Sequence, residues 1–219
     1  MALRWFEAVF GCCETPSYTI NRSMFRLEDG PSGPRTVLQC LANRQLYQIG
    51  PFSTPTLAEL SQELLQLPAI TTALGRATFR HGHGDVRSFL TDVRNAGSVF
   101  QVASQFNCLE MTGPGVSPAR GISIYAHDPT QGPACAMSCP ASTVLRNYFP
   151  PPYYETATPS QQINTMSKVE KLLKDKYWAM QNGYLLPVDT GKMKELTNVI
   201  GQVSSPLAQE IVSAVAVGV

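Results

Sequence analysis

Glycine and proline interrupt this chain so often that it can form only short helices and strands. They account for 16 and 17 of its 219 residues. Near the N-terminus, three runs of strand-forming residues are separated by residues 29–34, which are all Asp, Gly, Pro or Ser, and by residues 42–44. Short strand-forming runs that alternate with turn residues indicate an antiparallel meander. We therefore expect strands at residues 23–28, 36–41 and 45–49.

Apolar residues at helical spacing mark a second group of elements. Leu57, Leu60 and Leu64 recur three or four positions apart, and Thr54 or Thr56 is the candidate cap of this helix. The same reasoning predicts further helices at residues 3–10, 85–94, 141–149, 160–180 and 189–202, and one that begins at Ser205 and Pro206.

The middle of the chain alternates strand-like and helical segments. Runs of β-prone residues at 77–80, 98–103 and 122–126 accompany the helical segment 85–94. A strand, a helix and a strand with short connections are typical of an α/β layer with parallel pairing. We expect an α/β fold with a mixed sheet flanked by helices, preceded by the N-terminal meander and followed by C-terminal helices.

This pattern also predicts how the chain is divided. We expect residues 1–70 to form an appendage of meander plus helix, and residues 71–219 to form the α/β domain. The last residues, 215–219, are apolar and β-prone with no polar tail. This ending predicts a domain that is truncated at its C-terminus.

The low charge of the chain excludes several classes of protein. Charged residues make up 15% of the sequence and the formal net charge is +1, whereas about 25% is usual in soluble proteins. Nucleic-acid binding needs a basic excess, and long disorder needs low hydrophobicity with high net charge. The longest apolar stretch, residues 211–219, is too short for a membrane span, which needs about 18 residues. We therefore expect neither nucleic acid nor a membrane as partner.

The cysteines and the N-terminus bear on the compartment. Six cysteines show no disulfide framework, and Glu7 interrupts the apolar stretch that a secretory signal would need. These features predict reduced thiols in an intracellular protein, either cytoplasmic or nuclear.

A short histidine motif raises the possibility of metal chemistry. His81, His83 and Asp85 resemble the H-x-H-x-D stretch of binuclear metallohydrolases, in which two histidines share a metal. His127 is the one other histidine, and such sites need further histidine ligands. We therefore expect no metal and no cofactor, and a metallohydrolase is the less favoured alternative.

Four other stretches have the residue types of a nucleotide site. Glycine lets a ligand approach the backbone, carboxylates and amides suit adenine and ribose, and free amides at a helix start can hold phosphates. Alternatively, Asp85 caps a helix, Gln105 and Asn107 satisfy backbone groups at a turn, and the last two stretches are plain turns. The stretches are Gly84-Asp85-Val86, Ser104-Gln105-Phe106-Asn107, Gly113-Pro114-Gly115-Val116 and Asp128-Pro129-Thr130-Gln131-Gly132-Pro133-Ala134.

The order of these stretches resembles the macrodomain family and its poly(ADP-ribose) glycohydrolase relatives. The similarity covers roughly residues 76–190 and implies a macrodomain-like fold that binds ADP-ribose or an ADP-ribosylated protein. The resemblance implies that Asp85 contacts the adenine, that Gln105 faces the distal ribose with Asn107 nearby, and that Gly113, Gly115 and Val116 line the diphosphate loop. Val86, Gln131 and Gly132 are further expected ligand-binding residues.

The resemblance also bears on catalysis. The glycohydrolases carry a glutamine followed by two glutamates, one of which is the acid, whereas here Gly132 and Pro133 follow Gln131. If this chain hydrolyses an ADP-ribosyl bond, the acid must come from Glu110 or Asp128, which flank the expected site. Water would attack the anomeric carbon while a carboxyl group assists departure, and a dry environment raises the pKa of a carboxyl group to suit that role. The alternative is that Glu110 is an ordinary surface residue.

The lysines support a different hypothesis. All six lie at or after Lys168, and the first 167 residues carry only arginine as their basic residue. The segment from Lys168 to Lys194 is either a solvated helix face or the contact surface of a noncatalytic protein-interaction domain.

Overall fold

The computed structural model describes residues 4–67, 83–98, 104–128, 130–174, 176–201 and 206–216. The chain divides into two compact units, each described by itself below. The first comprises Met1–Phe52, Asp85–Asn164 and Met180–Tyr184, and the second comprises Ser53–Gly84, Thr165–Ala179 and Leu185–Val219. The boundary that we expected between residues 70 and 71 lies outside the described residues.

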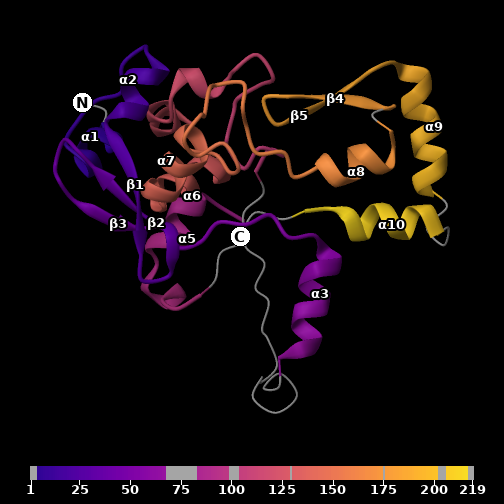
Figure 1. The fold of residues 1–219 in the computed structure, drawn as a ribbon, viewed down its shortest axis with the longest axis horizontal. Coiled ribbons are helices and arrows are strands. Elements are labelled where there is room, and N and C mark those ends of the chain that lie inside the picture. Colours follow the sequence, from indigo (N-terminus) through magenta and orange to yellow (C-terminus); the bar gives the residue numbers. More distant parts are fainter. Residues whose placement is uncertain are drawn as a thin grey trace. The chain divides into compact units, whose positions relative to one another are not determined.

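The first unit contains the predicted antiparallel meander. Strands β1 (Phe25–Gly30), β2 (Gly33–Cys40) and β3 (Leu46–Gln48) follow one another in the sheet, and Figure 1 shows them beside the N-terminal helix. Phe25 pairs with Cys40, and Val37 pairs with Gln48. The turn residues at 29–34 therefore place the hairpin where the sequence predicts it.

Short helices make up most of the rest of this unit. Their termini follow local rules: Ser17 caps α2 by accepting a hydrogen bond from the Ile20 amide, and Pro140 occupies the first turn of α7. The helices are α1 (Trp5–Phe10), α2 (Tyr18–Ser23), α5 (Val86–Thr91), α6 (Gln131–Ser138) and α7 (Pro140–Tyr148), with 3₁₀ turns η1 (Val93–Asn95), η2 (Pro118–Arg120) and η3 (Ser123–His127).

An aromatic core joins α1, the meander and α7. Phe10 is fully buried and packs edge-on against Phe25, with ring centroids 5.0 Å apart. Such edge-to-face pairs contribute beyond the apolar area that they bury. Tyr125 and Tyr148 are also buried in this cluster, so η3 and α7 share one core with the meander.

One carboxylate ties these elements together. Glu14 accepts hydrogen bonds from the backbone amides of Ile122 and Ser123 and from the Tyr148 hydroxyl. Gly121 lies so close that a Cβ atom there would overlap the Glu14 carboxylate. The segment after α1 is thereby fixed to the start of η3 and to α7.

The second unit is built from helices and the stems of a hairpin. Thr56 begins α3 with a capping box, in which Thr56 and Glu59 bond reciprocally. Lys168 in α8 pairs with Glu59 at 2.9 Å, and α10 contacts α3, α8 and α9. The elements are α3 (Leu57–Gln66), α8 (Ser167–Leu172), α9 (Thr190–Gly201) and α10 (Pro206–Ala214), with strands β4 (Trp178–Gln181) and β5 (Tyr184–Pro187).

Two predicted elements are wrong. The strand expected at residues 122–126 is replaced by the 3₁₀ turn η3 (Ser123–His127), because the amides of Ile122 and Ser123 bond to Glu14. Residues 160–180 do not form one helix: α8 ends at Leu172, and Lys174 has a positive φ of 57°. The end of this segment is strand β4, which pairs with β5 across an Asn182-Gly183 turn.

The fold is mixed α/β, and the two sheets of the described residues are small and antiparallel. The strand expected at 77–80 and most of that expected at 98–103 lie outside the described residues. Among the helices that the structure describes, none has the length and hydropathy needed to cross a membrane.

The bond between Tyr148 and Glu14 makes a testable prediction. Hydrogen bonds to charged groups contribute about 1.5–3 kcal/mol, so we expect Tyr148→Phe to lower the free energy of unfolding by about that amount in a urea titration. Tyr47→Phe is the matched control, because the Tyr47 hydroxyl donates to the neutral carbonyl of Val9 and its loss should cost only about 1 kcal/mol. Equal losses in the two variants would contradict the importance that we assign to the carboxylate.

Candidate functional site

The candidate site is built on a tightly wound loop at residues 105–111. The Gln105 side chain bonds to both backbone groups of Met111, accepting from its amide and donating to its carbonyl, each at 2.9 Å. The Cys108 amide donates to the Gln105 carbonyl, and the Leu109 amide donates to Asn107 Oδ1. Cys108 has a positive φ of 59°, as a tight turn requires. The loop therefore has a defined shape of its own.

This loop presents Glu110 in one orientation. Leu109 and Met111 are 2% and 3% exposed and anchor the chain on either side of it. The Glu110 amide donates to the Tyr125 hydroxyl at 3.0 Å, which attaches the loop to η3. The side chain of Glu110 is itself partly buried at this position.

The carboxyl group of Glu110 lies against the first turn of α6. Its Oε2 occupies the space that a Cβ atom would take at Gly132, so a glycine is needed for this contact. Thr130 is the N-cap residue of α6, but its side chain does not cap the helix. Its hydroxyl instead donates to Asp128 Oδ1 at 2.6 Å. The first turn of α6 therefore has no side-chain cap.

This environment raises the pKa of Glu110 to about 7. The main cause is desolvation by burial, the positive charge of Arg146 acts in the opposite direction, and the negative charge of Asp128 adds to the rise. Buried carboxyl groups hold their protons because ionisation in a low dielectric is costly. At neutral pH, Glu110 is therefore divided between its acid and its carboxylate form.

Two thiols and a guanidinium interact electrostatically with the same carboxyl group. Burial raises the pKa of Cys108. The positive charge of Arg146 lowers this pKa in part, and the negative charge of Glu110 raises it further. Burial also raises the pKa of Cys135, with contributions from Cys139 and Glu110. Thiols with raised pKa values are poor nucleophiles at neutral pH, so Glu110 is the group best suited to acid–base chemistry here.

The tip of the β4–β5 hairpin, Met180–Tyr184, packs against the loop within the first unit. The Tyr184 hydroxyl donates to the Met111 carbonyl at 2.6 Å, and the Phe106 amide donates to the Gly183 carbonyl at 2.9 Å. Asn107 is 1% exposed, and its amide nitrogen donates to Gln162. The amides of Gln105 and Asn107 are thus bonded within the loop and its neighbours.

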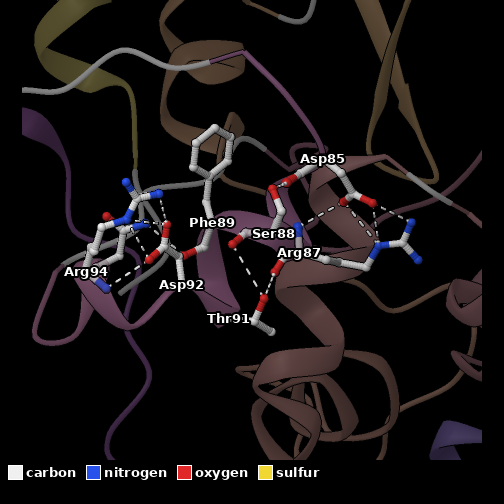
Figure 2. A network of polar contacts seen from close by, with 8 residues as sticks. Asp85, Arg87, Ser88, Phe89, Thr91, Asp92 and Arg94 are labelled. Carbon is white, nitrogen blue, oxygen red and sulfur yellow. Dashed lines mark hydrogen bonds and ion pairs between the residues drawn. The ribbon is translucent and has the colours of Figure 1, made fainter.

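Asp85 is the N-cap of α5 and is held by Arg87. Its carboxylate accepts a bond from the Arg87 amide and forms a bidentate ion pair with the Arg87 guanidinium, as Figure 2 shows. Asp92 repeats this arrangement with Arg94 seven residues later. The Arg87 side chain lowers the pKa of the exposed Asp85 carboxyl. Helix α5, which continues with Val86, packs against α6 and so adjoins the helix that Glu110 touches.

Two further predicted residues are glycines that follow the 105–111 loop in the sequence. Gly113 and Gly115 lie in a turn closed by the Val116 amide and the Gly113 carbonyl, and a Cβ atom at either glycine would meet open space. The side chain of Asn182 donates to the Pro114 carbonyl at 2.7 Å, which fixes this turn to the hairpin tip.

The histidine motif is only partly described. His81 lies outside the described residues, whereas His83 and Asp85 are described. Within those parts of the chain that the structure describes, no group of three or more His, Cys, Asp or Glu side chains is arranged to hold a metal ion. The structure brings together Glu110, Asp128 and Gly132 among the predicted residues, with Gln131 at the start of the same helix.

Comparison of this chain with protein-family models, with curated proteins and with solved structures finds no significant match.

Sequence analysis assigned no role to Arg146. Its contribution depends on how α7 packs beside α6, where the Thr143 hydroxyl donates to the Ala136 carbonyl. A basic residue in the last turn of a helix usually interacts with the helix dipole, so its position alone would not have revealed it. The lack of any lysine before Lys168 is the one usable signal, because it leaves arginine as the cation of the site.

The environment of Glu110 makes a testable prediction. Asp128→Asn removes a negative charge that raises the pKa of Glu110, so we expect this pKa to fall below about 7. The measurement is a ¹³C NMR titration of the glutamate side-chain carboxyl carbons. Asp29→Asn, which removes a carboxylate near the end of strand β1, is the control and should leave the titration unchanged. A Glu110 titration that is insensitive to Asp128→Asn would show that the two groups do not interact.

Proposed function

We propose that this chain binds an ADP-ribosyl group and hydrolyses the bond between its ribose and the attached group, with Glu110 as the general acid. The observation that carries this proposal is the carboxyl group of Glu110, which has a pKa of about 7 and lies against Gly132 at the uncapped start of α6. The order of the sequence stretches, which resembles the macrodomain and glycohydrolase families, supports the choice of ligand.

The proposed reaction uses two carboxyl groups. Glu110 gives its proton to the departing group while water attacks the anomeric carbon, and Asp128 accepts a proton from that water. A general acid works best when its pKa is near the operating pH, since it then holds a proton and can still release it. The bonds from Thr130 to Asp128 orient the second carboxylate.

The proposal assigns the other predicted residues to the ligand and to its support. Asp85 and Val86 would meet the adenine, and the backbone of Gly113, Gly115 and Val116 would follow the diphosphate, with Gln131 and Gly132 beside it. Helix α5, which begins directly after Asp85, packs against α6, and this packing supports the arrangement. Gln105 and Asn107 would act by holding the loop that presents Glu110, since their amides are already bonded.

Removal of the acid is the direct test. Glu110→Gln keeps the size of the side chain but cannot supply a proton, so we expect hydrolysis of ADP-ribosylated protein to slow by a factor of about 10²–10⁴. Affinity for ADP-ribose, measured by titration calorimetry, should change little. Gly132→Ala should cause a similar loss of activity, because its methyl group would displace the Glu110 carboxyl. Glu28→Gln, in strand β1, is the matched control and should retain full activity.

The pH dependence gives a second readout of the same variants. In the wild-type chain, kcat/KM should decline as the pH rises through about 7, because Glu110 loses its proton there. Binding of ADP-ribose without turnover would identify a noncatalytic binding module. An absence of binding heat at millimolar ADP-ribose would overturn the proposal as a whole.

A further inference from the structure

A cavity of about 360 Å³ in the first unit has no role in the proposed function. It is lined by residues 4–7 at the start of α1, by residues 13 and 14, and by turn η3. None of the residues assigned above to the proposed reaction or its ligand is among the described residues that line it. Its volume lies within the range of small-molecule sites, which is about 300–1,000 Å³. The chemistry of the lining therefore indicates what the cavity can hold.

Part of this lining is apolar. Trp5 contributes from α1, and Ile124 and Ala126 contribute from η3. The Trp5 indole is fixed, because its Nε1 atom donates to the Ser123 carbonyl at 3.3 Å and its ring meets that of Phe6 edge-on. A fixed aromatic ring offers a large contact area to another aromatic group at little cost in conformational entropy. This part of the cavity therefore favours an aromatic body.

The lining also carries a positive and a negative charge that the protein binds only weakly. Arg4 Nη1 lies 3.6 Å from Glu7 Oε2, whereas charge-assisted hydrogen bonds are about 2.7–2.9 Å long. The same nitrogen donates to Cys13 Sγ at 3.6 Å, and sulfur is a weak acceptor. The Arg4 and Glu7 side chains are 75% and 48% exposed, and exposed ion pairs contribute little to stability, so a ligand can engage both charges. The carboxylate of Glu14, by contrast, already accepts bonds from two backbone amides and the Tyr148 hydroxyl.

We propose that this cavity binds a free α-amino acid with an aromatic side chain. Such a molecule carries a carboxylate and an ammonium group on one carbon atom, next to an apolar body. Its carboxylate would accept hydrogen bonds from Arg4, its ammonium group would pair with Glu7, and its ring would lie against Trp5. The match of both charges and of the apolar part distinguishes an amino acid from a simple acid or amine. The inference does not depend on the proposed function.

Cys13 provides a direct test of occupancy, because this exposed residue lines the same cavity. The rate at which iodoacetamide alkylates its thiol in the full chain is measured by peptide mass spectrometry, with and without L-phenylalanine. About 10 mM ligand fills about nine-tenths of a site with a Kd of about 1 mM, so alkylation of Cys13 should slow by about tenfold. Cys139 is also exposed but is not among the described residues of the lining, so its rate should stay unchanged. An unprotected Cys13, or equal protection of both thiols, would overturn the inference.

Two analogues of the ligand test the two charges separately. The first, 3-phenylpropionate, lacks the ammonium group, and the second, 2-phenylethylamine, lacks the carboxylate, whereas both keep the ring. At the same concentration, each should protect Cys13 less than L-phenylalanine does, by a factor of about three or more, because one exposed ion pair is lost. If either analogue protects as well as the amino acid, the cavity does not recognise both charges and the inference fails.

Two variants assign each charge of the ligand to its partner. Glu7→Gln should remove the advantage of L-phenylalanine over 3-phenylpropionate, and Arg4→Gln should remove its advantage over 2-phenylethylamine. Each rate is compared with the ligand-free rate of the same variant, since Arg4 donates to Cys13 Sγ. Arg26→Gln and Glu63→Gln change exposed residues elsewhere and are the matched controls, which should keep the wild-type order of the three ligands. Unchanged preferences in the Arg4 and Glu7 variants would contradict the proposed binding mode.

Discussion

The first unit depends on the carboxylate of Glu14. It binds the amides of Ile122 and Ser123 and the Tyr148 hydroxyl, and so connects segments more than one hundred residues apart. Burial, followed by the nearby charge of Glu14, raises the pKa of Tyr148, which keeps its donor proton at any physiological pH. With η3 and α7 fixed in this way, Tyr125 can hold the Glu110 loop. The position of the candidate acid is thus set from the N-terminal segment.

Neutral side chains make most of the hydrogen bonds that hold the loop of the candidate site. The amides of Gln105 and Asn107 close the loop, and the hairpin tip holds it through Tyr184 and Asn182. Hydrogen bonds between neutral amide groups cost less to desolvate than ion pairs do. They can therefore be buried beside a carboxyl group without neutralising its charge. A carboxyl group surrounded in this way keeps a high pKa.

Local signals predicted the local structure, and distant contacts account for what they missed. Turn residues indicated the meander, and Thr56, one of the two candidate caps, begins α3. The strand expected at 122–126 failed because its amides bond to a carboxylate that lies far away in the sequence. The Asn182-Gly183 dipeptide is a strong hairpin signal that would have predicted β4 and β5. Glu110 was found from its place beside the glycine stretches, whereas Arg146 required the packing of α7.

The raised pKa of Glu110 indicates that its ionised form does not stabilise the fold. Its pKa is about 7 in the folded chain, whereas an unfolded chain gives a glutamate an ordinary value near 4.3. Between these two pH values the folded chain binds more protons than the unfolded chain. The contribution of Glu110 to the free energy of unfolding is therefore greatest at low pH and declines as the pH rises through 7. A glutamine would avoid this loss at a similar size. Groups that lower the stability of a protein are concentrated at functional sites, because catalysis and binding require side chains that the stability of the fold alone would not favour.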